Sequence, residues 1–262
     1  MKILVTGASG FIGTRFCELF PGKVFKLPRV DSVGEIVEKI KEVNPDCVVH
    51  LAGRFIGKHT SEDIDSLIDS NVRFGTRVLE AMKECGINRI VTAQTYWQHY
   101  DYRSYSPVNL YAATKQAFED VLDYYCEVHG FSAAAMVLHD TYGPKDYRKK
   151  LFTVLSEMTE VKIPHEDRLI DFVYIDDVCS ALSFAVEDTR NRTGKKRYIV
   201  STRQPVTLAT AIQLWSEATG NDITIIRNGS LGRDMRYPIE GQWVAGWKPV
   251  HNLSEGLMKT YQ

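Results

Sequence analysis

Residues 2–13 read K-I-L-V-T-G-A-S-G-F-I-G. A short run of apolar and β-branched residues, typical of a buried strand, leads directly into three glycines spaced three apart, and an apolar helical pattern follows. In such a turn Gly7 permits the sharp change of direction, Gly10 lets the backbone approach a pyrophosphate, and Gly13 lets the helix pack on the sheet. The N-terminus of the helix then faces the phosphates. The stretch predicts a dinucleotide-binding loop, and a strand–helix turn without a ligand is the alternative.

Short apolar segments alternate with amphipathic segments along the chain beyond this loop. That rhythm is typical of a parallel sheet covered by helices on both faces. We therefore predict an α/β fold, a Rossmann-type doubly wound parallel sheet with a smaller C-terminal substrate-binding lobe. The expected strands are 2–6, 24–27, 47–51, 89–92, 133–138 and 197–201, and the expected helices are 11–20, 33–43, 68–85 and 110–125.

The alternation becomes irregular in the second half of the chain, which defines the expected domains. Residues 1–145, with returning segments near 171–202, are predicted to form the dinucleotide-binding domain. Residues 146–170 and 203–262 are predicted to form mainly the substrate-binding lobe. No linker of the kind that separates independent domains lies between them.

Composition excludes several classes of protein. The 262 residues are 44% hydrophobic and 25% charged, a balance that excludes wholesale disorder. The formal net charge of −1 predicts no general attraction to nucleic acid or to an anionic membrane. The five cysteines contain no C-x-x-C pair, so neither a disulfide framework nor a metal site is expected. Without a long apolar run or a signal-peptide pattern, the expected location is the cytoplasm.

The segment after the second predicted strand bears on the choice of cofactor. An acid at that point accepts the ribose hydroxyl of NAD, whereas a basic residue suits the 2′-phosphate of NADP. Lys26 and Arg29 favour NADP(H), while Asp31 keeps NAD(H) possible. For Arg29 the alternative is a solvated surface charge.

A tyrosine and a lysine stand four residues apart at the start of the helix expected at 110–125. Tyr111 and Lys115 therefore share one face of that helix, one turn apart. A nearby ammonium group favours the phenolate and is expected to lower the pKa of Tyr111. A tyrosine tuned in this way exchanges a proton near neutral pH. Such pairs also occur by chance, so the prediction depends on the dinucleotide loop that precedes it.

Several further motifs follow in a fixed order, and together they resemble the extended short-chain dehydrogenase/reductase family, also described as the NAD-dependent epimerase/dehydratase family. The resemblance covers almost the whole chain, and T-Y-W-Q-H-Y with D-T-Y-G-P-K-D-Y is similar to the CDP-abequose/paratose synthase-like 4-ketoreductases. The matching segments are T-G-A-S-G-F-I-G (6–13), D-C-V-V-H-L-A-G (46–53), N-V (71–72), Y-A-A-T-K (111–115), T-Y-G-P (141–144), D-F-V-Y-I-D-D-V (171–178) and G-W-K-P (246–249).

The resemblance implies roles for particular residues. Thr95, with Thr92 as the alternative register, would hydrogen-bond the reacting oxygen beside Tyr111, and Lys115 would also hold the cofactor ribose. His139 would approach the nicotinamide, although a structural role is the favoured alternative. A homodimer through the helices at 68–85 and 110–126 is implied as well. The residues expected at the cofactor are Gly7, Ser9, Gly10, Phe11, Ile12, Gly13, Arg29, Asp31, Leu51, Ala52, Gly53, Asn71, Lys115 and His139.

The residues after Thr95 favour one reaction within the family. Dehydratases place carboxylates there, and coupled epimerase-reductases place a cysteine there with a histidine after Y-G-P; this chain has Tyr96-Trp97 and Lys145 instead. The expected function is NADP(H)-dependent reduction of the 4-keto group of a nucleotide-diphosphate-linked deoxysugar. An NAD-dependent 4-epimerase and a catalytically silent cofactor-binding scaffold or regulator are the alternatives. The residues expected at the substrate are Tyr96, Trp97, Lys150, Arg233 and Arg236.

Overall fold

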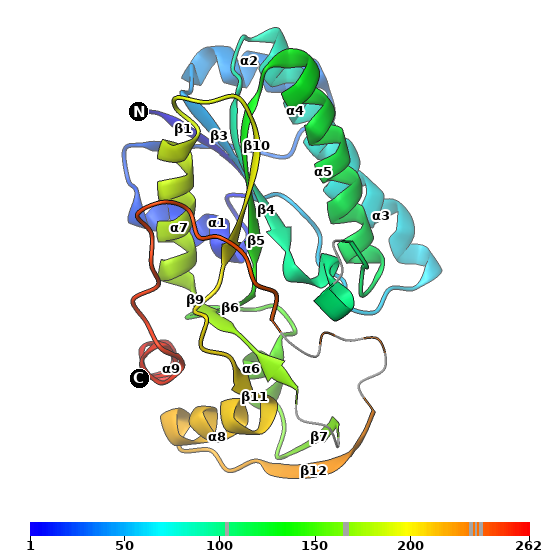
Figure 1. Ribbon diagram of the computed structural model, residues 1–262, viewed down its shortest axis with the longest axis vertical. Helices are drawn as coiled ribbons and strands as arrows, with labels where there is room; N and C mark the ends of the chain where they lie inside the picture. Colours follow the sequence, from blue (N-terminus) through cyan, green and yellow to red (C-terminus); the bar gives the residue numbers. More distant parts are fainter. Residues whose placement is uncertain (103–104, 165–167, 231–232, 234, 236–237) are drawn as a thin grey trace.

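The computed structural model describes the whole chain except residues 103–104, 165–167, 231–232, 234 and 236–237. Its centre is a six-stranded parallel sheet in the order β10-β5-β4-β3-β1-β2 (Figure 1). This order confirms the predicted doubly wound Rossmann-type sheet. The strands are β1 (Ile3–Thr6), β2 (Val24–Leu27), β3 (Cys47–His50), β4 (Arg89–Thr95), β5 (Ser132–Leu138) and β10 (Gly194–Val200).

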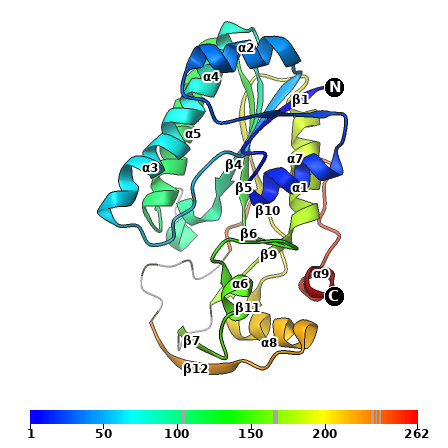
Figure 2. The same cartoon turned by 180° about the vertical axis from the view of Figure 1, so that it is seen from behind.

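Helices cover both faces of the sheet. Figures 1 and 2 show α1 and α7 on one face and α2, α4 and α5 on the other. The central strands are buried on both sides, which explains why they read as continuous apolar runs rather than as alternating ones. The helices are α1 (Phe11–Leu19), α2 (Val33–Val43), α4 (Phe74–Glu84), α5 (Leu110–His129) and α7 (Ile175–Asp188).

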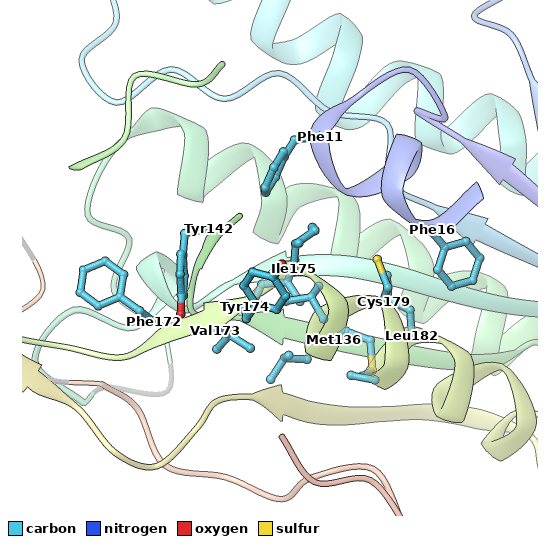
Figure 3. Packing of buried hydrophobic residues seen from close by; sticks show 14 of the residues in the cluster. Phe11, Phe16, Met136, Tyr142, Phe172, Val173, Tyr174, Ile175, Cys179 and Leu182 are labelled. Atoms are coloured by element: carbon cyan, nitrogen blue, oxygen red, sulfur yellow. The ribbon is translucent and has the colours of Figure 1, made fainter. Parts of the chain in front are cut away.

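One large apolar cluster joins the α1 and α7 side of the sheet to the lobe. Figure 3 shows Phe16 of α1 directed into the same cluster as Cys179 and Leu182 of α7, while Tyr142 and Phe172 continue it toward the lobe. Trp215 of the lobe, 1% exposed, belongs to this cluster too. The lobe is therefore packed onto the sheet through a shared core.

The helix expected at 68–85 is longer and contains an irregular turn. It begins as α3 (Ile64–Ile68), passes through a π-helical turn (Asp69–Arg73) and continues as α4. Such single π turns inside α-helices are frequent at functional sites. Here the turn carries Asn71, one of the residues expected at the cofactor.

The lobe lies beyond the carboxyl end of the sheet (Figures 1 and 2). Strands β6 and β9 pair in parallel and lead from the sheet into it, and β7 with β12 and β8 with β11 form two further pairs. No helix among the described residues is both long and apolar enough to span a bilayer. The remaining elements are β6 (Asp140–Tyr142), α6 (Leu151–Leu155), β7 (Glu160–Pro164), β8 (Leu169–Ile170), β9 (Phe172–Tyr174), β11 (Val206–Thr207), α8 (Leu208–Thr219), β12 (Thr224–Gly229), α9 (Leu253–Tyr261) and short 3-10 turns at Ser61–Asp63, Tyr96–Gln98 and Tyr100–Tyr102.

Candidate active site

A cavity of about 1160 Å³ lies at the carboxyl ends of β1, β3, β4 and β5, between the sheet and the lobe. In doubly wound folds ligands bind at this edge. The glycine loop, the start of α5 and residues 140–163 all contribute to its wall. Of the residues expected at cofactor or substrate, those that line this cavity are Gly7, Gly10, Phe11, Ile12, Gly13, Leu51, Gly53, Thr95, Tyr96, Trp97, Tyr111, Lys115, His139 and Lys150.

The glycine loop has the close backbone contacts that require glycine. Gly7 has a φ of +68°, and a Cβ there would lie 2.5 Å from the backbone nitrogen of Ala52. A Cβ on Gly13 would lie 2.1 Å from the carbonyl oxygen of Gly7. Gly13 thus lets α1 pack against the turn itself, rather than on the sheet as we expected. At Gly10, the N-cap residue just before α1, a Cβ would meet only the Gly7 oxygen at 3.2 Å, so that side of the loop is open.

These contacts fit a dinucleotide. A pyrophosphate needs exposed backbone N–H groups at a helix N-terminus, and Gly10 supplies no side chain to cover those of α1. The loop is also tied to the end of β3, because the hydroxyl of Thr6 accepts from the N–H of Ala52 at 3.2 Å. The same hydroxyl lies 2.9 Å from Nδ1 of His50, whose pKa is lowered to about 3 by burial and by Lys115. His50 is therefore neutral and part of the scaffold.

Tyr111 and Lys115 line the cavity from the first turns of α5. Asn109 caps this helix by accepting from the N–H of Ala112 at 3.0 Å, and its amide nitrogen donates to the carbonyl of Gly57 at 2.9 Å. Asn109 therefore fixes the start of α5 relative to the loop that follows β3.

The pKa directions of this pair differ from our expectation. Burial raises the pKa of Tyr111 to about 12, with Arg148 acting in the opposite direction. Burial lowers the pKa of Lys115 to about 8, with Glu119 acting in the opposite direction. Desolvation disfavours both charged forms, and this effect outweighs the attraction that we expected to lower the pKa of Tyr111. In the unliganded protein Tyr111 carries its proton at neutral pH.

Of the two candidate threonines, Thr95 reaches the cavity and Thr92 does not. Thr92 is fully buried within the sheet, where its hydroxyl accepts from the amide of Gln94 at 3.3 Å. The hydroxyl of Thr95 accepts from the N–H of Trp97 at 3.3 Å, and the N–H of Thr95 donates to Gln98 Oε1 at 3.0 Å. Because one lone pair of the Thr95 hydroxyl is used by Trp97, its proton is directed elsewhere and suits a donor role.

Asn71 links the loop after β3 to α5. Its Oδ1 accepts from the N–H of Arg54 at 2.7 Å, and its Nδ2 donates to the carbonyl of Arg54 at 3.1 Å and to the hydroxyl of Thr114 at 2.9 Å. The side-chain amide of Asn71 thus pairs with both the backbone N–H and the backbone carbonyl of Arg54, as the backbone of a neighbouring strand would. Asn71 itself does not line the cavity; it positions Gly53 and the turn of α5 that carries Lys115.

Sequence reasoning missed a polar cluster at the end of β5. Asp140 Oδ1 accepts from Lys150 Nζ at 2.9 Å, and Asp140 Oδ2 accepts from the hydroxyl of Tyr96 at 2.5 Å. The Tyr96 ring stacks on His139 with centroids 4.9 Å apart, and Nδ1 of His139 lies 3.1 Å from the carbonyl oxygen of Val200. The carboxylate immediately before T-Y-G-P was the signal that could have indicated this cluster.

Arg29 and Asp31, the residues expected to choose between the 2′-phosphate of NADP and the ribose hydroxyl of NAD, lie at a second, smaller pocket of about 150 Å³. Arg29 donates from Nη1 to the hydroxyl of Ser70 at 2.7 Å, and its guanidinium lies 5.9 Å from the ring centroid of Phe74. Asp31 lines the same pocket. Two arginines that we did not single out, Arg73 and Arg77 of the π turn and α4, complete it with Asp69.

Three further expected contact residues lie elsewhere. Ser9 and Ala52 belong to the loops that frame the cavity without lining it. Arg233 donates to the carbonyl of Pro107 at 2.9 Å and to the hydroxyl of Ser106 at 3.0 Å, so its guanidinium braces the segment after β4. Arg236 falls outside the described residues. Arg148, in contrast, reaches the site, with its guanidinium carbon 4.3 Å from the ring centroid of Phe11.

The comparisons with known proteins agree with this geometry. The model of the NAD dependent epimerase/dehydratase family matches residues 3–201. The chain belongs to this family. Its members are NAD(P)-dependent enzymes of the extended short-chain dehydrogenase/reductase type, so the family predicted from the motifs is confirmed.

Individual relatives are distant. CDP-abequose synthase of Yersinia pseudotuberculosis is 23% identical over 251 residues, covering 86% of this chain and 87% of the relative. UDP-glucuronate 4-epimerase 3 of Arabidopsis thaliana is 25% identical over 324 residues, covering 98% and 75%. The UDP-glucose 4-epimerase of Thermus thermophilus, solved with NAD, superposes with a TM-score of 0.84 at 23% identity, covering 100% of this chain and 98% of that one. At this identity the structural likeness shows the fold.

Proposed function

We propose that the protein uses NADPH to reduce the 4-keto group of a nucleotide-diphosphate-linked deoxysugar. The observation that carries the proposal is that Tyr111, Thr95 and Lys115 line one cavity, because a reduction must deliver one proton to the oxygen that becomes a hydroxyl and the phenol of Tyr111 can supply it. Similarity to CDP-abequose synthases supports this reaction class. The residues that follow Thr95 are Tyr96 and Trp97 rather than carboxylates, which argues against a dehydration.

The pocket beside Arg29 supports NADPH rather than NADH. Three guanidinium groups, those of Arg29, Arg73 and Arg77, surround it together with the carboxylates of Asp31 and Asp69. Arg73 is already paired with Asp69 at 2.7 Å. Arg29 and Arg77 therefore provide the cationic hydrogen-bond donors that a 2′-phosphate requires.

The chain's own residues have distinct tasks in this reaction. When bound, the reduced nicotinamide supplies a hydride to the carbonyl carbon. Thr95 donates a hydrogen bond to the carbonyl oxygen and orients it. Tyr111 transfers its proton to that oxygen as negative charge develops on it. Lys115 stabilises the resulting tyrosinate and holds a ribose hydroxyl, and its buried ammonium is more effective there than it would be in water.

Basic side chains of the lobe are the proposed contacts of the substrate diphosphate. Arg148 lies over the ring of Phe11, the first residue of α1, and Lys145 and Lys149 line the same cavity. Arg148 is paired with Asp146 at 2.7 Å, which holds its planar fork in one orientation. Nε and Nη2 of Arg148 already donate to Asp146 and to the carbonyl of Thr141, so Nη1 is the nitrogen proposed to donate to a diphosphate oxygen.

An NAD-dependent 4-epimerase is the second candidate, favoured by the likeness to the UDP-glucose 4-epimerase of Thermus thermophilus. That enzyme class uses the same tyrosine and lysine but retains its cofactor. In this chain Asp31 would then bind the ribose hydroxyls in place of Arg29.

Titration of purified protein with NADPH and NADH, after analysis of any nucleotide that copurifies, separates the candidates. Exchangeable binding that favours NADPH supports the reductase. Tightly retained NAD favours the epimerase and overturns the reductase. Failure to bind either nucleotide would contradict both enzyme proposals.

We also propose a homodimer through α4 and α5. Tyr124 and Val128 of α5 are 52% and 60% exposed, although they stand on an otherwise well-packed helix. Burying them between two copies would remove apolar surface from water. Sedimentation analysis tests this: Val128→Glu should convert a dimer to a monomer, and a monomeric wild type contradicts the proposal.

A further inference from the structure

We propose that Asp140, Lys150 and Tyr96 form a subsite that binds a hydroxyl group of a neutral sugar and disfavours a sugar carboxylate at the same place. The inference deepens the proposed function and rests on it, because it assumes that a nucleotide-linked sugar enters the cavity. It concerns the choice of sugar and does not depend on which nucleotide carries it.

The three side chains meet inside the cavity although they come from different segments. Tyr96 follows the end of β4, Asp140 begins β6, and Lys150 stands before α6. The Asp140 side chain is 11% exposed and that of Lys150 is 22% exposed. Both side chains line the cavity. A ligand in the cavity therefore meets both members of the ion pair.

The cluster lies next to the groups proposed to act on the carbonyl. Lys150 Nζ is 4.5 Å from the ring centroid of Phe55 and 4.8 Å from that of Trp97. The Phe55 ring in turn meets the ring of Tyr111 edge-on, with centroids 5.1 Å apart. One aromatic ring thus separates Lys150 from Tyr111. A sugar held with its carbonyl at Tyr111 presents a neighbouring ring substituent to Asp140 and Lys150.

The hydrogen-bonding capacity left in the cluster suits a hydroxyl group. Asp140 uses one lone pair of each oxygen, for Lys150 and for Tyr96, and a carboxylate has about four such sites. An ammonium group has three donors, and Asp140 takes one of those of Lys150. A sugar hydroxyl both donates and accepts, so it fits between a carboxylate acceptor and an ammonium donor.

A sugar carboxylate is a poor match for the same place. A sugar carboxylate has only hydrogen-bond acceptors, and its charge is negative like that of Asp140. Burial acts to raise the pKa of Asp140, but Lys150, Tyr96 and Arg168 act to lower it, and the net pKa lies below 3.8. Asp140 is therefore anionic at neutral pH, and Lys150 is already paired with it. Bringing a second anion there costs free energy that a hydroxyl avoids.

The test measures what the sugar adds to the affinity of the nucleotide. Dissociation constants are determined by calorimetry, in the presence of NADP⁺, for UDP, UDP-glucose and UDP-glucuronic acid. The ratio of the UDP dissociation constant to that of each nucleotide sugar is the affinity gained from the sugar. CDP-glucose against CDP and dTDP-glucose against dTDP cover the other nucleotides. We expect the wild type to gain affinity from glucose and to gain little or none from glucuronic acid.

Two variants probe the cluster. Asp140→Asn should reduce the gain from glucose about tenfold or more, since hydrogen bonds to a charged acceptor are lost. It should also improve the relative binding of UDP-glucuronic acid, because Lys150 is then available to pair with the sugar carboxylate. Tyr96→Phe keeps the ring and removes one hydroxyl, so a smaller loss of the gain from glucose is expected. This milder variant tests the cluster if Asp140→Asn proves unstable.

Asp188→Asn is the matched control. Asp188 also accepts from a tyrosine hydroxyl, that of Tyr198 at 2.9 Å, and pairs with Arg192 at 2.8 Å, but it does not line the cavity. It should leave every ratio unchanged. Equal gains from glucose and glucuronic acid in the wild type, or equal ratios in wild type and both cluster variants, overturn the inference. If none of the nucleotide sugars binds while NADP⁺ does, the proposed function fails and the inference fails with it.

Discussion

Replacing Lys115 by Met should stabilise the unliganded protein while it removes activity. Lys115 is 5% exposed, and no hydrogen bond or ion pair to a described residue offsets the burial of its ammonium group. Burial lowers its pKa from 10.5 to about 8. Because each pKa unit corresponds to about 1.36 kcal/mol, the buried charge costs the folded state about 3 kcal/mol at neutral pH.

The sign of the pH dependence follows from the direction of this shift. Between about pH 8 and pH 10.5 the unfolded chain binds the proton and the folded protein does not, so wild-type stability from this group rises with pH. The cost falls to about 1.4 kcal/mol at pH 9.5. The advantage of Lys115→Met over the wild type should shrink by about 2 kcal/mol between pH 7 and pH 9.5.

Urea unfolding at both pH values measures this difference directly. Lys41→Met, which removes an exposed lysine from α2, is the control and should change stability by less than about 0.5 kcal/mol at either pH. If Lys115→Met is less stable than the wild type at pH 7, or if its advantage does not change with pH, the reasoning about the buried ammonium group is wrong.

Four further substitutions test separate parts of the site. Tyr111→Phe should lower kcat by about 10²–10⁴ and leave the NADPH dissociation constant unchanged in a fluorescence titration; retained turnover contradicts the proton-donor role. Gly7→Ala forces a positive φ and a 2.5 Å contact with the Ala52 nitrogen, so NADPH binding and the melting temperature should both fall. Asn71→Ala removes three hydrogen bonds and should cost about 1–3 kcal/mol in urea unfolding; an unchanged midpoint contradicts its bracing role. Arg29→Gln should weaken NADPH binding about tenfold and leave NADH binding unchanged, and equal effects on both contradict the 2′-phosphate assignment.

Local sequence rules were sufficient for the sheet and for part of the site. The glycine spacing and the apolar strand segments predicted the parallel Rossmann-type sheet, because each pattern rests on residues close together in the chain. Thr95 followed from the family resemblance together with counting along one strand. The structure distinguishes Thr95 from Thr92 because strand β4 extends to Thr95 before the chain turns.

Contacts between distant segments could not be predicted in the same way. Thr95 pairs with Leu138 in the β4–β5 register, which brings the next residues, Tyr96 and His139, side by side. Only that register brings Asp140 to Tyr96, 44 residues away in sequence. The pKa of Tyr111 was misjudged for a related reason: burial depends on packing from several segments, whereas the spacing to Lys115 is local.

Isotope transfer tests the central claim most directly. The protein is incubated with NADPH deuterated at the transferred position and a nucleotide-linked 4-keto-6-deoxysugar, and the product is analysed by mass spectrometry and NMR. We predict one deuterium at C4 of the sugar and equimolar loss of NADPH, with both at least about 10²-fold slower in Tyr111→Phe. A bound but unconsumed NADPH, or a product formed without deuterium, would contradict the account.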